Sequence, residues 1–163
     1  MAQIQVNLEM NHLIAKKAIL IDTTHNLRTE ILEAITDPDL TFSLGGSSLS
    51  FAELLLEQGT FQMAYTKAFG SFELVFDATA PAIHTVAEFK TWFETLDQAM
   101  MAALEQLSDT DLKKTIARGT WGLPAETTFF TYRESVFIFA AKASVYLRAL
   151  GKPLPTQLLG WVA

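Results

Sequence analysis

Residues 146–155, Tyr-Leu-Arg-Ala-Leu-Gly-Lys-Pro-Leu-Pro, carry the signals that end a long helix. Gly151 suits the left-handed backbone conformation that commonly caps a helix, and Pro153 prevents the helix from continuing. The pair Leu123-Pro124 precedes the start of the same helix. The sequence therefore predicts a final helix that follows Leu123-Pro124 and ends at Leu150.

Three further helices are predicted upstream from apolar spacing and capping signals. The first spans about Leu8 to Ile35, and Asp37-Pro38 ends it because proline disfavours helix in the residue before it. The second begins at the capping box Ser50-x-x-Glu53 and the third at the capping box Thr85-x-x-Glu88. In this motif the two side chains satisfy backbone N–H groups that the start of a helix leaves free.

The predicted core faces differ in polarity between the first two helices. The face of the first helix is mainly apolar: Leu13, Leu20, Thr24, Leu27, Ile31 and Ile35. The face of the second is unusually polar for a core: Phe51, Leu54, Leu55, Gln58, Gln62 and Tyr65. In the long connection from Gly70 to Thr85, alternating Phe72, Leu74 and Phe76 predict a short strand. Four helices with one long connection, between the second and third, are typical of an all-α four-helix bundle.

Composition limits the classes of protein and partner. The 163 residues fit one domain, 1–163, and half of them are hydrophobic, which is ample for a core. A net charge of −6 without a basic stripe argues against a nucleic-acid partner. There is no cysteine, so disulfides and thiolate metal sites are excluded. No apolar run is long enough for a membrane span, and we expect a cytoplasmic protein.

Three segments resemble the DinB/YfiT-like superfamily. Residues 50–57 are similar to its Ser-hydrophobic-x-x-Leu-Leu-x-His pattern on the second helix, and residues 107–112 to its Leu-Ser-Asp-x-Asp-Leu connector. Residues 135–155 resemble its final helix, in which a His-x-x-x-His-Arg-Gly-Gln run precedes Tyr-Leu-Arg. The resemblance covers nearly the whole chain in the same order and spacing. It implies a DinB-like bundle of the up-down-down-up type.

The resemblance also locates a degenerate metal site. In that superfamily three histidines, one on helix two and two on helix four, hold a divalent metal, and members include thiol-dependent transferases, isomerases and metal hydrolases. The matching positions here are Glu57, Ser135 and Phe139. A neutral hydroxyl is a poor ligand for zinc or nickel, and a phenyl ring provides none. We therefore expect no cofactor, and a divalent metal is the alternative.

Two interpretations of these positions stay open. In the first, Phe139 fills the space of the metal and imidazoles, and Lys142 gives Glu57 an ammonium partner. In the second, Glu57 and Lys142 are ordinary solvated residues. Around the same cavity, Gln58, Trp121 and Tyr132 are candidates for the lining of a ligand pocket. The alternative is that the aromatic residues belong to the core, as they do far more often in bundle helices.

Two other features lie outside this cavity. His25 lies one turn from Asp22, which predicts a surface helix pair rather than a site. Residues 158–163, Leu-Leu-Gly-Trp-Val-Ala, are too apolar for a free tail and are expected to pack on their own bundle or on a second subunit. Because members of the superfamily are often dimers, the resemblance favours a homodimer.

Three functions remain open at this point. The leading interpretation is a metal-free, non-catalytic protein that binds a small molecule or a protein partner. The second is an enzyme of the superfamily's transferase or hydrolase type that uses Glu57 as a base or single ligand with Lys142 beside it. The third is a structural, dimeric interaction protein that uses the Trp161 tail.

Overall fold

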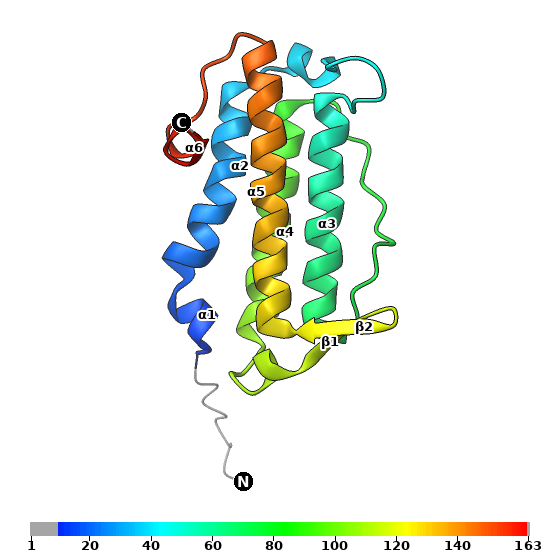
Figure 1. Ribbon diagram of the computed structural model, residues 1–163, viewed down its shortest axis with the longest axis vertical. Helices are drawn as coiled ribbons and strands as arrows, with labels where there is room; N and C mark the ends of the chain where they lie inside the picture. The colour runs from blue at the N-terminus through cyan, green and yellow to red at the C-terminus, as the bar shows by residue number, and fades with distance from the viewer. Residues whose placement is uncertain (1–9, 163) are drawn as a thin grey trace.

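Four long helices form the body of the computed structural model, which describes residues 10–162 (Figure 1). They are α2 (Thr23–Ala34), α3 (Phe51–Ser71), α4 (Val86–Glu105) and α5 (Ala125–Ala149). In Figure 1, α2 and α5 run upward and α3 and α4 run downward, which confirms the predicted up-down-down-up bundle. The shorter elements are α1 (His12–Ala15), the π-helical turn η1 (Ala18–Asp22), the 3₁₀ turns η2 (Asp37–Thr41) and η3 (Asp111–Lys113), the strands β1 (Thr115–Arg118) and β2 (Trp121–Pro124), and α6 (Thr156–Val162).

The first predicted helix is interrupted, so its prediction as one continuous element was wrong. Leu8 lies outside the described residues, and the helical backbone begins after Asn11, whose Oδ1 accepts from the N–H groups of Leu13 and Ile14 at 3.1 Å each. The π-helical turn η1 lies between α1 and α2, and a π turn contains more residues than an α-helical turn. The buried face therefore shifts, and Ile21 is buried where the regular spacing had predicted Leu20.

The predicted helix ends are confirmed. The backbone N–H of Ser50 donates to Glu53 Oε2 at 2.6 Å, and the equivalent bond from Thr85 to Glu88 Oε2 is 3.0 Å. After the C-terminal end of α5, Gly151 has a φ of 69°. The N–H groups of residues 151 and 152 donate to the carbonyls of residues 148 and 147, which completes the Schellman cap of α5.

The connection between α3 and α4 returns along the length of the bundle without a regular strand (Figure 1). Phe72 adopts the left-handed conformation and ends α3, and Leu74 alone is buried among the three residues of the predicted strand. The segment forms one bridge, between Glu73 and Ala117, in which Leu74 N–H donates to Ala117 O at 2.8 Å and Ala117 N–H donates to Phe72 O at 2.9 Å. Ala117 belongs to the β1–β2 hairpin, which the sequence had not predicted because residues 115–124 show no alternating pattern.

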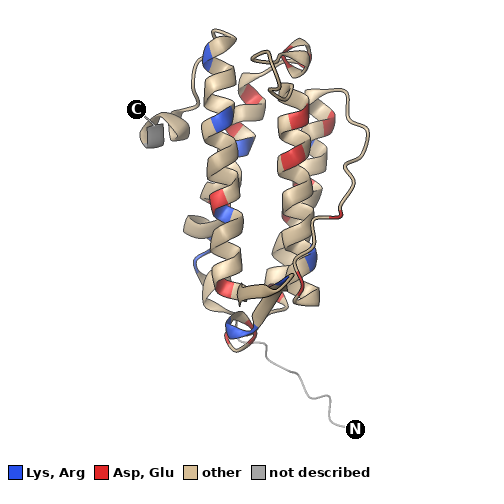
Figure 2. Cartoon of the chain, turned by 45° about the vertical axis from the view of Figure 1, so that its right-hand side comes forward, with Lys and Arg blue, Asp and Glu red and all other residues tan. Residues whose placement is uncertain are grey.

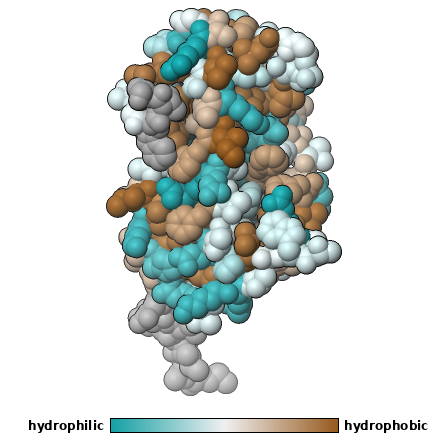
Figure 3. Space-filling model, in the orientation of Figure 1, coloured by the Kyte–Doolittle hydropathy of each residue, from teal (hydrophilic) through white to brown (hydrophobic). Residues whose placement is uncertain are grey.

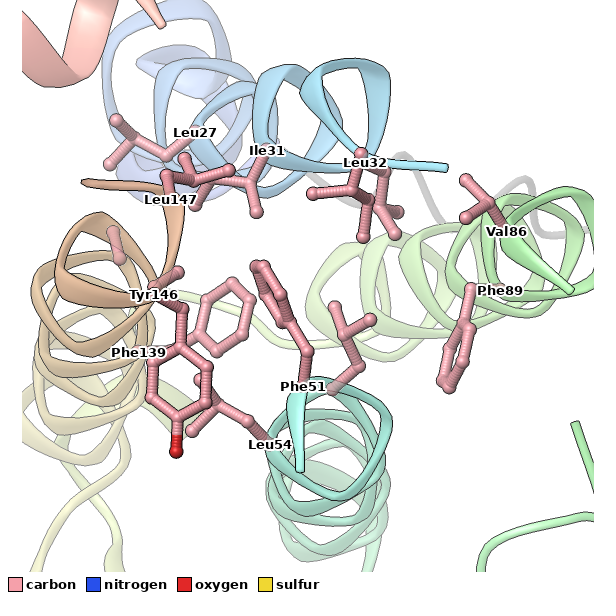
Figure 4. Packing of buried hydrophobic residues seen from close by; sticks show 14 of the residues in the cluster. Leu27, Ile31, Leu32, Phe51, Leu54, Val86, Phe89, Phe139, Tyr146 and Leu147 are labelled. Atoms are coloured by element: carbon pink, nitrogen blue, oxygen red, sulfur yellow. The ribbon is translucent and has the colours of Figure 1, made fainter. Parts of the chain in front are cut away.

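Buried side chains fall into two clusters along the bundle axis. One cluster includes Leu27, Phe51, Phe89 and Leu147 and is shown in Figure 4, where side chains from α2, α3, α4 and α5 meet. The other lies toward the hairpin and contains side chains from η1, α3, α4 and α5. The predicted apolar positions of α3 are all buried, and so are its two glutamines.

The C-terminal segment packs on its own bundle. Leu158, in α6, is 2% exposed and belongs to the cluster that contains Leu27. Gln157 Nε2 donates to Thr23 O at 2.6 Å, which attaches α6 to α2. Of the two arrangements predicted for residues 158–163, packing on their own bundle is the one that Leu158 adopts. The side chain of Trp161 lies outside the described part of the chain.

Charged and apolar residues are interspersed on the face of the molecule shown in Figure 3. Acidic and basic residues are distributed over several helices in Figure 2, and hydrophilic and hydrophobic residues alternate over the face shown in Figure 3. Among the helices of residues 10–162, none has the length and apolar character needed to cross a membrane.

Gly59 allows α4 to approach α3 closely. A Cβ atom built on Gly59 would lie 2.1 Å from the Trp92 ring, whereas a Cβ on Gly70 of the same helix would meet nothing within 4 Å. We expect Gly59→Ala to destabilise the fold by about 1–2 kcal/mol despite the better helix propensity of alanine, because the indole must move. Gly70→Ala is the matched control and should be neutral or stabilising by up to ~1 kcal/mol. Urea unfolding of both variants measures this, and equal effects would contradict the close approach.

Candidate functional site

Five of the predicted site residues line one pocket between α3 and α5. Glu57 and Gln58 come from α3, and Ser135, Phe139 and Lys142 come from α5. The pocket has a volume of about 70 Å³, and its remaining walls are Leu54, Phe61 and Ile138. Spacing along the two helices brings these residues together, since positions 135, 139 and 142 recur at helical intervals on one face.

Glu57 and Lys142 form an ion pair at the edge of this pocket. The Lys142 Nζ to Glu57 Oε2 distance is 3.4 Å, as the hypothesis of an ammonium partner requires. The two side chains are 50% and 36% exposed for Lys142 and Glu57, so the interaction is a solvated one of small energy. Both interpretations from the sequence thus hold in part: the residues pair, and they do so at the surface.

The residues at the positions that the sequence resemblance matches to metal ligands, Glu57, Ser135 and Phe139, do not fit a metal. Phe139 is buried in the core with Leu54 and Tyr146 (Figure 4) and has no donor atom. Ser135 Oγ donates its proton to Tyr132 O at 2.7 Å. Within residues 10–162, no group of three or more His, Cys, Asp or Glu side chains is arranged to hold a metal ion. A zinc-type site needs about three such donors.

Gln58 is the one interior polar group of this pocket without a partner. Its side chain is 2% exposed, and its Nε2 has no hydrogen-bond partner in the described part of the chain. An unsatisfied buried amide N–H costs about 1–3 kcal/mol of stability.

The other two predicted lining residues lie elsewhere. Trp121 is on β2, 52% exposed, with its ring 5.2 Å from the Arg118 guanidinium, and lines a crevice of about 10 Å³ at the hairpin. Tyr132 is buried in the interior of the bundle and lines no part of the α3–α5 pocket. The prediction that Gln58, Trp121 and Tyr132 share one cavity was wrong, because α5 rotates residue 132 to the face that meets α2.

Tyr132 instead belongs to a polar layer that crosses the whole bundle. We use this term for five side chains: His25 and Arg28 of α2, Gln62 of α3, Asp97 of α4 and Tyr132 of α5. Arg28 Nη2 donates to the two carboxylate oxygens of Asp97 at 2.7 and 2.6 Å. Gln62 accepts from Arg28 at 2.8 Å and donates to Asp97 at 2.8 Å, so each group of the layer has a partner.

His25 connects the two ends of this layer. Its Nε2 lies 2.8 Å from Tyr132 Oη, and its Nδ1 lies 3.2 Å from Asp97 Oδ1. The donor in the bond between Nε2 and the Tyr132 hydroxyl depends on the imidazole tautomer, and the Asp97 carboxylate, which only accepts, favours the tautomer with the proton on Nδ1. Burial lowers the pKa of His25 to about 4 and raises the pKa of Tyr132, so both groups are neutral at pH 7.

The predicted surface pair of His25 with Asp22 was therefore wrong. Asp22 bonds to Lys17 instead, with 2.5 Å between Oδ1 and Nζ, and His25 turns into the bundle. The partners of His25, Arg28 and Asp97 lie 34 to 107 residues away in the sequence. The only local signal was the polar character of the α3 face, which includes Gln62.

A trough of about 570 Å³ opens above the polar layer between α2 and α4. His25 and Asp97 line its floor, together with the apolar side chains Ile21 and Met101. Its upper walls carry Asp22, Asn26, Thr29, Gln98 and Glu105 among others. The π-helical turn η1 forms part of one wall, a backbone feature that is frequent at functional sites. The trough is shallow and open to solvent, and His25 and Asp97 place polar groups at its base.

Comparisons with known proteins define the fold. No family model and no curated protein matches the chain. A crystal structure of a DinB-like protein, YjoA from Bacillus subtilis, superimposes with a TM-score of 0.70 and 17% identity over 83% of this chain and 92% of that chain. A DinB-like protein from Bacillus cereus gives a TM-score of 0.71 and 15% identity over 82% of this chain and 90% of that one. The fold is a DinB-like helical bundle, as the sequence resemblance implied.

The low pKa of His25 makes stability depend on pH. The folded state holds His25 at a pKa of about 4, below its ordinary value of 6.5, so the unfolded chain binds this proton more readily. The corresponding stability is complete above pH 6.5 and is lost as the pH falls toward 4, a change of about 3 kcal/mol. His12, whose pKa is raised by Asp109 and Glu126, contributes with the opposite sign.

His25→Asn should remove most of this decrease. Urea unfolding from pH 7.5 to 4 for the wild type and the variant isolates the contribution of His25 as the difference between their slopes. Parallel slopes would show that His25 is not the buried neutral group described above.

The polar layer and the surface pair should differ in their response to mutation. Asp97→Asn leaves the buried Arg28 charge without its carboxylate and should destabilise the fold by about 3 kcal/mol. Glu57→Gln removes the carboxylate of the exposed pair and should cost less than about 1 kcal/mol. Equal losses in chemical denaturation would contradict this assignment of the two ion pairs.

Proposed function

We propose that this DinB-like bundle is a cytoplasmic binding protein that takes a small polar molecule in the α2–α4 trough without a metal. The observation that carries the proposal is the trough floor, where His25 and Asp97 belong to a layer fixed by all four long helices. Side chains that are held by several partners form a preorganised surface, which reduces the entropy lost when a ligand binds.

The cost of the layer supports a role beyond packing. Arg28 is 1% exposed and lies over the Phe93 ring at 4.0 Å, so its charge is removed from water. A buried ion pair is often no more stabilising than apolar residues of the same volume. We infer that the layer is retained because it positions Asp97, whose side chain remains 27% exposed to the trough.

The groups in the trough favour a ligand with hydrogen-bond donors. Asp97 presents a partly exposed carboxylate, and a carboxylate only accepts hydrogen bonds. Glu105 and the carboxylate of Asp22 lie on the walls, while Lys17 is already paired with Asp22. Ile21 and Met101 offer apolar contact beside them. An uncharged or cationic molecule that carries hydroxyl, amide or amine groups fits this lining.

The two other interpretations have less support. The enzyme interpretation requires Glu57 and Lys142 to face an open cavity that admits a substrate, but the pair lies at the edge of a pocket of only about 70 Å³. The interaction protein requires a tail that is available to a second subunit, but Leu158 packs on its own bundle. A homodimer and a protein partner remain proposals.

Native mass spectrometry tests the binding proposal directly. We expect wild-type protein, purified without chelators and mixed with the low-molecular-mass fraction of a cell extract, to gain an adduct that is not a metal. Ala102→Trp places an indole in the trough and should abolish the adduct. Ala87→Trp adds the same side chain at an exposed position of α4 outside the trough and should retain it.

Two results of this experiment would contradict the proposal. An adduct that both tryptophan variants retain would place the ligand elsewhere. A mass increase equal to stoichiometric zinc, nickel or iron would show that the chain holds a metal despite its donor set. The same spectra give the oligomeric state of the protein.

A further inference from the structure

The outward side of α5 is apolar where that of α2 is polar. Within the four long helices, all of which the structure describes, the exposed large hydrophobic side chains belong to α5: Phe130, Ile138 and Val145, which are 37%, 58% and 52% exposed. The exposed positions of α2 are Thr23, Asn26, Thr29 and Glu33. In Figure 1, α5 lies at the front of the bundle, and no element of residues 10–162 crosses its outward side. This side of α5 is therefore uncovered in the single chain.

The exposed apolar residues of α5 belong to one continuous stripe. We use the term α5 stripe for six exposed residues that recur at intervals of three or four: Phe130, Glu134, Ile138, Ala141, Val145 and Arg148. At about 100° of rotation per residue, all six fall within an arc of about 80°. Single exposed apolar side chains are normal on a protein surface, whereas apolar residues at these intervals are typical of a helix that packs on another helix.

Two charges of opposite sign lie at equal distances from the centre of the α5 stripe. Glu134 precedes Ala141 by as many residues as Arg148 follows it, and neither side chain forms an ion pair or a hydrogen bond with the described part of the chain. If two copies meet in antiparallel orientation with Ala141 opposite Ala141, Glu134 of each copy lies opposite Arg148 of the other. A parallel orientation would place like charges opposite each other at both positions. The charges therefore favour an antiparallel pair of identical helices.

We propose that the α5 stripe is an interface through which two copies of this chain form an antiparallel dimer. Such a two-fold interface must be complementary to itself, and the arrangement of Glu134 and Arg148 about Ala141 meets this requirement. The small side chain of Ala141 allows the two helix axes to approach to about 8 Å, the lower end of the usual range. Ile138 of one copy then lies beside Val145 of the other, and both lose their exposure to water.

The surroundings of the α5 stripe are compatible with this dimer. Lys142 lies next to the centre and contacts Glu57 Oε2 at 3.4 Å, so the two copies bring together two neutralised pairs rather than two unpaired ammonium groups. No residue of α5 lines the trough between α2 and α4, which therefore stays open in both copies. Ala102→Trp, which fills the trough, should dimerise with wild-type affinity, so this proposal and the proposed function fail independently.

Sedimentation equilibrium of the full chain tests the dimer. The stripe from Glu134 to Arg148 spans only about 21 Å of helix, and a single helix pair of this length buries less than the roughly 1,600 Å² of a standard interface. We therefore expect a weak dimer with a Kd of about 10–100 µM, measured over concentrations from about 5 µM to about 1 mM. Ile138→Glu places a charge in the interface and should weaken the dimer at least about thirtyfold.

Ile19→Glu is the matched control, because it makes the same substitution at a residue of η1 that is 70% exposed and lies outside the α5 stripe. It should dimerise with wild-type affinity. Charge reversal tests the orientation of the helices. Glu134→Arg and Arg148→Glu should each weaken the dimer about tenfold, because each places like charges opposite each other, and the double variant should return to within about threefold of the wild-type affinity.

A cross-link tests the position of the two-fold axis. The chain has no cysteine, so Ala141→Cys introduces a single thiol at the centre of the α5 stripe. Because the two Cβ atoms at this position meet across the axis, oxidation above the Kd should convert most of the protein to a disulfide-linked dimer. Ala87→Cys, at an exposed position of α4, is the control and should stay monomeric under the same conditions.

Three results would overturn the inference. The first is a wild-type protein that stays monomeric at about 1 mM, a measurement that stands even where a variant fails to fold. The second is an equal dimer affinity for Ile138→Glu and Ile19→Glu, which would place the interface outside the α5 stripe. The third is a double charge-reversal variant that dimerises no better than the two single variants, which would exclude the antiparallel pairing of Glu134 with Arg148.

Discussion

The bidentate contact between Arg28 and Asp97 is the constraint on which the arrangement of the bundle depends. Arg28 belongs to α2 and Asp97 to α4, the pair of helices that frames the trough. Because a buried guanidinium tolerates few geometries, the contact fixes the distance and rotation between these helices. Around this contact, Gln62 of α3 bonds to both Arg28 and Asp97. His25 of α2 bonds to Tyr132 of α5. The apolar core divides into two clusters on either side of this layer.

Local signals predicted the fold, and nonlocal contacts decided the site. The capping boxes at Ser50 and Thr85 and the glycine cap at 151 act within four residues, so the sequence alone locates three of the four helices. The π-helical turn could not be predicted in this way. Thr24 Oγ1 donates to Leu20 O at 2.8 Å beside it, but threonine makes such bonds in regular helices too.

The candidate site shows the same division. Residues 135, 139 and 142 share a face of α5, and the family pattern placed Glu57 opposite them, so the α3–α5 pocket was predictable from spacing and resemblance. The polar layer was not, because His25 and Asp97 each look like ordinary surface residues of an amphipathic helix. Their burial follows only from the way four helices meet. The likeness to DinB-like proteins at 15–17% identity shows how far the side chains of this bundle can change while the fold persists.

The long connection after α3 has a topological consequence. Its residues from 75 to 84 are mostly exposed and carry no regular secondary structure, and its one bridge to the hairpin is at Glu73. A break in the chain at this segment would separate two helical hairpins, one with α2 and α3 and the other with α4 and α5. In the polar layer, the bond between Arg28 and Gln62 lies within the first hairpin. The other contacts, including Arg28 with Asp97 and His25 with Tyr132, join the two hairpins. Two fragments produced by such a break would recognise each other through these buried hydrogen bonds. A split protein needs this property in order to reassemble in one register.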